Sequence, residues 1–292
     1  MSFRETSEVL KTSEVCPLKE AYQNPPEERY VQPFMRMLHA RTWKRMISMT
    51  EKLLILVYHR VHADGDRTAP DDHGRIGLSE FQRQMDCLKE SGFQTVTHRE
   101  IATWLYDGIA LPERAVAIDF DDNRLHVFEN ALPVLTEHGF KATVFVITEL
   151  AGGNPVFGPN DYPAMRWRHL EQLRDQDWCI APHTRHHLHL AGPQRTPRDE
   201  AEIWDELAGS RQIVEERLGI TAPYFAYPSG SWNEAIEAQV RKVFRTARHW
   251  HQSYTGSCPI NTRKTNPYRL AGVNVCDLLS FERFRLMVDL SG

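Results

Sequence analysis

Short apolar runs alternate with amphipathic stretches along most of this chain. Residues 52–58 read Lys-Leu-Leu-Ile-Leu-Val-Tyr, and residues 115–120 read Ala-Val-Ala-Ile-Asp-Phe. A continuous apolar run of this length is typical of a parallel strand that is covered on both faces. Apolar residues then recur at helical spacing from residue 79 until the glycine at residue 92. The pattern therefore predicts repeated strand–helix units from residue 52 onward.

The remaining elements follow the same alternation. We expect strands at residues 95–97, 142–147, 178–181, 224–227, 244–247 and 271–275. We expect helices at residues 101–105, 132–138, 167–173, 197–218 and 233–243, and a last helix from residue 280. Repeated βα units over about 240 residues predict an α/β fold and favour a barrel, although the pattern alone leaves a doubly wound sheet open.

Residues 1–50 differ from the rest of the chain. They contain prolines at positions 17, 25, 26 and 33, and then a basic and apolar stretch over residues 34–46. We interpret residues 1–50 as a loosely packed N-terminal extension with one short helix, and a membrane-surface helix is the less favoured alternative. Residues 51–292 would then form a single catalytic domain.

Composition narrows the class of protein. The 292 residues carry a formal net charge of -4, so no basic surplus indicates a nucleic-acid partner. The five cysteines are widely spaced, which favours reduced thiols in a cytoplasm over a disulfide framework. The longest apolar run, at residues 53–58, is too short to span a bilayer. We therefore expect a cytoplasmic enzyme without a transmembrane segment, and the sequence leaves its oligomeric state open.

Two clusters of polar residues carry the candidate chemistry. Asp121 and Asp122 follow the apolar run that ends at residue 120, and His183 and His187 lie four residues apart about sixty residues later. One Asp and two His can hold a divalent ion and leave positions open for water and substrate. The second Asp is then free to act as a base. This donor set suits zinc, and also cobalt, nickel or iron.

Three motifs together resemble a known family. Residues 118–123, Ile-Asp-Phe-Asp-Asp-Asn, resemble the Thr-Phe-Asp-Asp-Gly motif of the polysaccharide deacetylases, which are the NodB-homology group of carbohydrate esterases. Residues 183–187, His-Thr-Arg-His-His, resemble the His-Ser/Thr-x-x-His motif of that family. Residues 225–230, Phe-Ala-Tyr-Pro-Ser-Gly, are similar to the third motif in the branch related to poly-N-acetylglucosamine deacetylases. The resemblance covers roughly residues 52–280 and implies a distorted (β/α)7 barrel.

The resemblance also implies roles for individual residues. Asp122, His183 and His187 would be the metal ligands, and Asp121 would be the general base. The backbone N–H of Tyr227 would help to stabilise the oxyanion. Three more residues follow predicted strands at the same end of the barrel, and we expect them to contact substrate. They are His59, which is equally well read as a structural histidine, Pro228, and Trp232, which would either stack on a sugar ring or pack.

Three departures from the family pattern affect the site. The Thr of the first motif is Asp119, which either forms a salt bridge or adds negative charge near the metal. The Arg of the third motif is Phe225, so we expect Arg269, with Arg166 behind it, to orient the base. The late Leu-x-His motif, which supplies the general acid, has no clear match. His249 and His251 are the nearby candidates for that role.

The sequence thus predicts a metal-dependent hydrolase that removes an acetyl group from an N-acetylated amino sugar in a glycan, a glycoconjugate or a sugar precursor. Two alternatives stay open. One is a metal-dependent amidohydrolase of a non-sugar cyclic amide, because some relatives of this fold hydrolyse such bonds. The other is a glycan-binding pseudoenzyme, which the absent acid and the lost Arg would explain.

Overall fold

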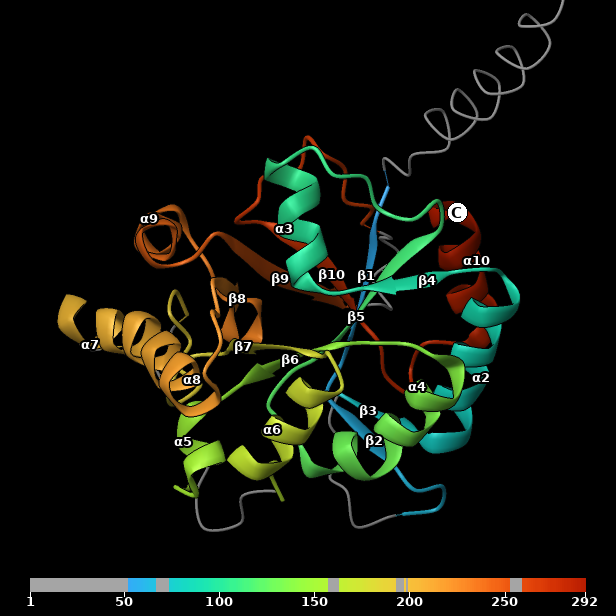
Figure 1. The fold of residues 1–292 in the computed structure, drawn as a ribbon, viewed down its shortest axis with the longest axis horizontal. Helices are drawn as coiled ribbons and strands as arrows, with labels where there is room; N and C mark the ends of the chain where they lie inside the picture. Colours follow the sequence, from blue (N-terminus) through green and yellow to red (C-terminus); the bar gives the residue numbers. More distant parts are fainter. Residues whose placement is uncertain (1–51, 67–73, 157–162, 193–196, 198, 253–258) are drawn as a thin grey trace, which may run out of the picture. The chain divides into compact units, whose positions relative to one another are not determined.

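A parallel sheet, curled into a nearly closed barrel and surrounded by helices, forms the centre of the molecule (Figure 1). It is seen in a computed structural model that describes residues 52–66, 74–156, 163–192, 197, 199–252 and 259–292. The N-terminal extension predicted at residues 1–50 lies outside the described residues.

Seven strands make up the barrel. They are β1 (Leu54–Tyr58), β5 (Ala115–Phe120), β6 (Thr143–Val146), β7 (Cys179–Pro182), β8 (Tyr224–Ala226), β9 (Thr246–Gln252) and β10 (Leu270–Asn274). Their order is β7-β6-β5-β1-β10-β9-β8, and each pair of neighbours is parallel. A further strand, β4 (Gln94–Val96), pairs with the first half of β5. The predicted distorted (β/α)7 barrel is confirmed.

Helices follow most strands and cover the outside of the barrel. They are α2 (Leu78–Glu90), α3 (His98–Tyr106), α4 (Leu132–His138), α5 (Thr148–Gly152), α6 (Trp167–Asp175), α7 (Glu200–Trp204), α8 (Ser210–Leu218), α9 (Glu234–Val243) and α10 (Phe281–Ser291). Shorter helical segments are η2 (Val127–Ala131), η3 (Asp205–Gly209) and η4 (Pro228–Gly230), and a separate pair of strands is β2 (Arg60–His62) with β3 (Arg75–Gly77). Across the described ranges, no helix is long and apolar enough to cross a membrane.

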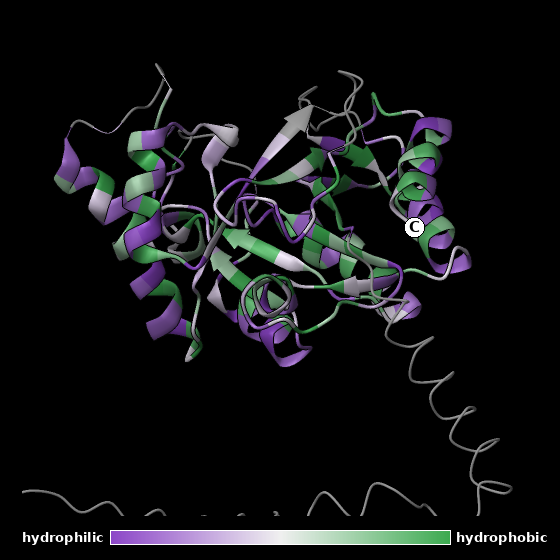
Figure 2. Cartoon of the chain, turned by 90° about the horizontal axis from the view of Figure 1, so that it is seen from above, coloured by the Kyte–Doolittle hydropathy of each residue, from purple (hydrophilic) through white to green (hydrophobic). Residues whose placement is uncertain are grey.

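Side-chain alternation along β5 separates the interior of the barrel from the layer between barrel and helices. Val116, Ile118 and Phe120 pack in the large cluster under the helices, whereas Ala115 and Ala117 belong to a smaller cluster with alternate residues of β1. The strand is buried along its whole length, which explains why five of its six residues are apolar. Figure 2 shows the same division, with mostly green strands at the centre and purple mixed into the surrounding helices.

Two predicted elements differ from the structure in ways that affect the candidate site. The helix expected over residues 197–218 begins only at Glu200, where the Asp199 side chain accepts a hydrogen bond from the N–H of Glu202 at 2.9 Å. It is then interrupted by the π-helical turn η3. The strand expected over residues 244–247 begins at Thr246 and continues to Gln252. This strand extends through polar residues because one of them, Arg248, has charged partners inside the barrel.

Candidate active site

The carboxyl ends of β5 and β7 carry the main polar residues. Asp121 and Asp122 follow β5, and the chain turns there because Asp122 and Asn123 take left-handed φ values of 67° and 38°. Asn123 stabilises this turn through its side-chain amide, which donates to the carbonyl of Met165 and accepts from the N–H of Ile147, both at 3.0 Å. Asn123 therefore takes up the left-handed conformation at the position of the motif glycine.

The histidine segment at residues 183–187 is held from outside the barrel. The carboxylate of Glu206 accepts hydrogen bonds from the backbone N–H groups of Arg185 at 2.9 Å and His186 at 3.0 Å. The backbone N–H of Thr148 donates to the carbonyl of Thr184 at 3.3 Å. Thr184 thus helps to hold the segment through its backbone carbonyl. These contacts fix a segment that includes two left-handed residues.

Asp122, His183 and His187 meet at one point. Oδ1 of Asp122 lies 3.3 Å from Nε2 of His187 and 3.6 Å from Nε2 of His183. One ligand atom from each residue lies within 4.8 Å of the others. Nδ1 of His183 donates to the carbonyl of Ala226 at 2.8 Å, which leaves its Nε2 lone pair directed at the site.

The protonation states of these groups favour binding a cation. Burial lowers the pKa of both imidazoles, and the pKa of His187 falls to about 3, so both rings are neutral at pH 7. Burial by itself would raise the pKa of Asp122, but the neighbouring His187 and the guanidinium of Arg124 lower it below its usual value. The site thus presents one carboxylate and two imidazole lone pairs.

Two buried carboxylate oxygens that lack hydrogen-bond donors show whether the site is suited to a metal. Oδ1 of Asp122 and Oδ2 of Asp121 are buried, and neither accepts a hydrogen bond from any described residue. Buried carboxylate oxygens without donors are costly, so their presence beside neutral imidazoles fits a site that binds a cation. One carboxylate with two imidazoles suits zinc, cobalt, nickel or iron. Asp122, His183 and His187 would hold the ion.

Arg248 orients Asp121, and sequence reasoning missed it. Its guanidinium donates to Oδ1 of Asp121, while Oδ2 faces His183 at 4.0 Å. Burial alone would raise the pKa of Asp121, but Arg248 lowers it, so the carboxylate is ionised. Arg269, predicted for this role, instead forms an ion pair with Glu237. The missed signal was the true length of β9, because Arg248 lies beyond the predicted end of that strand.

The third carboxylate, Asp119, points into the barrel and forms salt bridges. Its Oδ2 accepts from Nε of Arg248 and from Nε2 of His98, both at 3.0 Å. Asp119, His98 and Arg248 have no exposed side-chain surface. The first of the two expected alternatives for Asp119 is therefore the one observed.

The structure contradicts the role predicted for Tyr227. Its backbone N–H donates to the carbonyl of Arg248 at 2.9 Å, because the ladder between β8 and β9 continues past Ala226. The backbone N–H of Tyr227 is therefore not available to stabilise an oxyanion. The ring is fully buried beside Phe225, and burial raises the pKa of the hydroxyl well above its usual value. Pro228, predicted near the substrate, is buried at the start of η4.

Trp232 and His249 contact each other outside the barrel interior. The guanidinium of Arg269 lies over the Trp232 ring at 4.2 Å, and the His249 ring lies 6.0 Å away. Trp232 therefore packs rather than offering a clear face to a sugar. His249 alternates with the inward residue Arg248 along β9, so it points away from Asp121. The side chain of His251 lies outside the described part of the chain.

His59 is placed beside the base. Its Nε2 lies 3.9 Å from Oδ2 of Asp121, and its side chain is 17% exposed. Its ring meets Trp250 edge to face at 6.1 Å, so Trp250, which the sequence did not single out, lies near the same end of the barrel. Gly74 permits β3 to approach, because a Cβ there would lie 3.1 Å from Cβ of His59. Of the three predicted substrate contacts, His59 alone adjoins Asp121.

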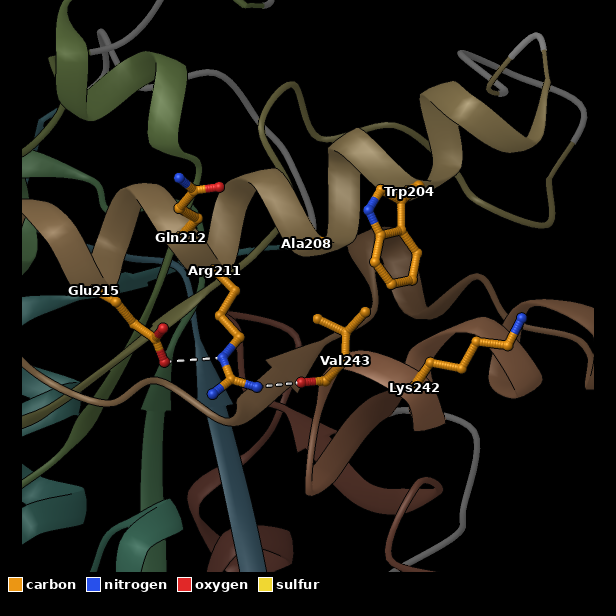
Figure 3. Close-up of a pocket in the computed structure, with 7 residues that line it drawn as sticks. All are labelled: Trp204, Ala208, Arg211, Gln212, Glu215, Lys242 and Val243. Carbon is orange, nitrogen blue, oxygen red and sulfur yellow. Dashed lines mark hydrogen bonds and ion pairs between the residues drawn. The ribbon is translucent and has the colours of Figure 1, made fainter.

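Figure 3 shows a separate hollow on the outer helices. It has a volume of about 220 Å³ and is lined by Trp204, Ala208, Arg211, Gln212, Glu215, Lys242 and Val243. Arg211 crosses it, donating to Glu215 at 2.8 Å and to the carbonyl of Val243. None of the predicted site residues lines this hollow, so we do not assign the chemistry to it.

Comparison with known proteins agrees with the motifs. Residues 108–246 match the polysaccharide deacetylase family. YxkH of Bacillus subtilis (strain 168), whose name assigns it provisionally to the polysaccharide deacetylases, is 27% identical over 218 residues, or 75% of this chain and 71% of its own. A poly-beta-1,6-N-acetyl-D-glucosamine N-deacetylase of Staphylococcus aureus (strain MSSA476) is 26% identical over 173 residues, or 58% of each chain.

Solved structures share the fold. A Streptococcus pyogenes deacetylase, PplD, in complex with acetate superposes with a TM-score of 0.68 at 20% identity, covering 81% of this chain and 98% of its own. IcaB from Ammonifex degensii superposes with a TM-score of 0.65 at 23% identity, covering 83% and 98%. At these identities the likeness establishes the fold alone.

Proposed function

Because the chain carries a polysaccharide deacetylase domain, we propose that it is a metal-dependent hydrolase that removes an acetyl group from an N-acetylated amino sugar. The sugar would belong to a glycan, a glycoconjugate or a sugar precursor, by analogy with the relative named for poly-beta-1,6-N-acetyl-D-glucosamine. One observation carries the proposal: Asp122, His183 and His187 meet at one point beside the carboxylate of Asp121.

Asp122, His183 and His187 would hold one divalent ion, with zinc preferred and cobalt, nickel or iron as alternatives. The bound ion would supply Lewis-acid chemistry, polarising the acetyl carbonyl and making water more acidic. Asp121 is suited to act as the general base, since Arg248 holds Oδ1 and leaves Oδ2 facing the site. It would take a proton from the attacking water.

Breaking the amide bond also requires a proton on the departing nitrogen. We assign this role to His59 rather than to His249 or His251. Support comes from the position of its Nε2, 3.9 Å from Oδ2 of Asp121. His59 would donate its proton to the amine as the C–N bond breaks, while Asp121 retains the proton from water.

A cytoplasmic location is part of the proposal. Of the five cysteines in the sequence, Cys87, Cys179 and Cys276 are described, and none of these three forms a disulfide. Reduced thiols agree with a reducing compartment. Fractionation of cells that produce the full chain, with detection in the soluble cytoplasmic fraction, is the expected result, and recovery outside the cell would contradict it.

Acetate release tests the proposed activity. We expect the zinc-loaded protein to release acetate from short oligomers of N-acetylglucosamine. Asp121→Asn should lower kcat by at least about 100-fold, because general bases contribute about 10²- to 10⁴-fold. Asp107→Asn is the matched control, since Asp107 pairs with Arg245 on the exposed surface and should leave kcat unchanged.

The same assay separates the alternatives. Cleavage of ureides or other cyclic amides without acetate release would select the non-sugar amidohydrolase. Zinc and glycan binding without turnover of either substrate class would select the pseudoenzyme. Both results would overturn the proposed deacetylase activity.

A further inference from the structure

Arg248 is the one described arginine that contacts Asp121, and it lies on a different strand from the arginine of the family motif. The motif position is Phe225 on β8, which stacks on Phe244 with ring centroids 4.8 Å apart, in the cluster outside the barrel. Arg248 on β9 lies opposite Ala226 of β8, inside the barrel. Arg248 therefore lies on the strand next to the one that carries the motif position, and on its inward face.

Arg248 is bound on two sides. Its Nε donates to Oδ2 of Asp119 at 3.0 Å, and its Nη2 donates to Oδ1 of Asp121. His98 donates to the same oxygen of Asp119 at 3.0 Å. The guanidinium lies 4.7 Å above the Phe145 ring. A buried guanidinium needs such partners because desolvating an unpaired charge is costly.

A missing side chain on the neighbouring strand makes room for Arg248. A Cβ at Gly272 of β10 would lie 3.0 Å from Cδ of Arg248 and 2.5 Å from Cγ2 of Val57. Contacts that short force a shift of the neighbouring atoms, and both neighbours are packed inside the barrel. Gly272 therefore makes room for both Val57 and Arg248.

We propose that Arg248 is the positioning residue for the base and that Asp119 and Gly272 are adaptations that hold it in place. Arg248 fixes Oδ1 of Asp121, so that Oδ2 faces the site. Asp119 fixes the other edge of the guanidinium, which prevents it from turning toward the cation site. The departure in sequence at position 119, Asp for Thr, then belongs with Arg248, whereas Phe225 faces the cluster outside the barrel.

The proposal rests on the proposed deacetylase activity and is tested with the zinc-loaded protein. We expect Arg248→Ala to lower kcat for acetate release by about 100-fold, because a misplacement of about 1 Å costs a factor of that order. KM and the dissociation constant for zinc should stay within about threefold, since Arg248 contacts neither the substrate nor the metal ligands in this scheme. Arg245→Ala, at an exposed arginine three residues earlier, is the matched control.

Two further measurements distinguish positioning from a structural role. Arg248→Lys keeps the buried charge and so should fold, but it cannot reach both carboxylates in the geometry of a guanidinium. We expect it to lose at least about tenfold in kcat. Added guanidinium should restore part of the activity of Arg248→Ala and none of the activity of Asp121→Asn. Asp119→Asn should lower kcat with unchanged zinc affinity.

These measurements distinguish failure of the proposed function from failure of the inference about Arg248. A parent protein that releases no acetate overturns both the proposed function and this inference. An active parent overturns this inference alone if Arg248→Lys keeps full kcat. An equal loss of zinc affinity and of kcat in Arg248→Lys also overturns it, because Arg248 would then support the metal site instead of the base.

Discussion

At the scale of single residues, the site depends on which oxygen of each carboxylate is already held. Arg248 binds Oδ1 of Asp121, and Arg124 binds Oδ2 of Asp122 at 3.0 Å. Each aspartate therefore keeps one oxygen that faces the histidines. The two adjacent residues are suited to different roles because their free oxygens have different neighbours: that of Asp122 lies 3.3 Å from Nε2 of His187, and that of Asp121 lies 3.9 Å from Nε2 of His59.

The identity of these aspartates and histidines was readable from the motifs, but their partners were not. Arg124 lies only two residues after Asp122, so its proximity was available from the sequence. Arg248 comes from a strand more than a hundred residues away, and only the register between β8, β9 and β10 brings it inside the barrel. Sequence alone also gave no reason to prefer His59 over His249 as the acid, because that choice depends on which side chains of β9 face the interior of the barrel.

Substitution of His59 is predicted to affect the chemical step. His59→Gln should lower kcat for acetate release by at least about 100-fold, because the departing amine would lose its proton donor. Its zinc affinity should stay within about threefold, since the three predicted ligands remain. Acetate release and calorimetric zinc titration are the two measurements, with His169→Gln on α6 as the control.

Unchanged kcat in His59→Gln would remove His59 from the mechanism. A large loss of zinc affinity would instead make it a fourth ligand.

At the scale of elements, the π-helical turn η3 has a specific consequence for the histidine segment. It carries Glu206, which is 1% exposed and accepts hydrogen bonds from the backbone of Arg185 and His186. Its Oε1 also lies 2.6 Å from Nδ1 of His186. π-Helical turns are often found at functional sites because they redirect one side chain. Here the redirected carboxylate fixes the segment between the two predicted imidazole ligands.

Glu206→Gln is predicted to weaken zinc binding. Glutamine has a single acceptor oxygen, so it cannot serve both the two backbone N–H groups that donate to Oε2 and the His186 ring at Oε1, and the segment would loosen. Loss of a residue that orients ligands costs about 10- to 100-fold in metal affinity. Calorimetric titration should show this loss, whereas Glu216→Gln, on the exposed side of α8, should bind zinc like the parent. Equal affinities for the two variants would contradict the role of Glu206.

The local sequence pattern explains why the π-helical turn η3 and the second half of β9 were not predicted. A helix stripe at residues 203, 207, 214 and 218 reads as one continuous helix, because periodicity does not reveal a one-residue insertion within it. Residues 248–252 contain too many polar side chains to read as a buried strand. In the structure the salt bridges of Arg248 make its burial favourable, which is a tertiary effect and invisible to local pattern.

At the scale of the whole molecule, the barrel gathers residues that are far apart in sequence. All its strands are parallel, so the residues after β1, β5 and β7 come to the same end, as expected from the sequence. The barrel path ends at β7 and β8, where no ladder joins the described residues. The hydrogen bond from His183 to Ala226 bridges these two strands. A metal held by His183 would therefore link β5 to the edge of this gap.

Zinc binding is accordingly predicted to stabilise the whole barrel. At free zinc about 100-fold above the dissociation constant, a ligand that binds only the folded state adds about 2.7 kcal/mol. For a domain of this size that corresponds to a rise in Tm of about 5 to 10 °C. Thermal unfolding of chelator-treated protein with and without zinc measures the rise. Asp122→Asn and His183→Ala should lose it, since each removes a predicted ligand.

Asp121→Asn distinguishes the two adjacent carboxylates in the same experiment. It should retain the rise in Tm while losing acetate release, because Asp121 is assigned to the base and is not one of the three proposed ligands. A rise that disappears in Asp121→Asn, or that persists in Asp122→Asn, would reverse the assignment of ligand and base.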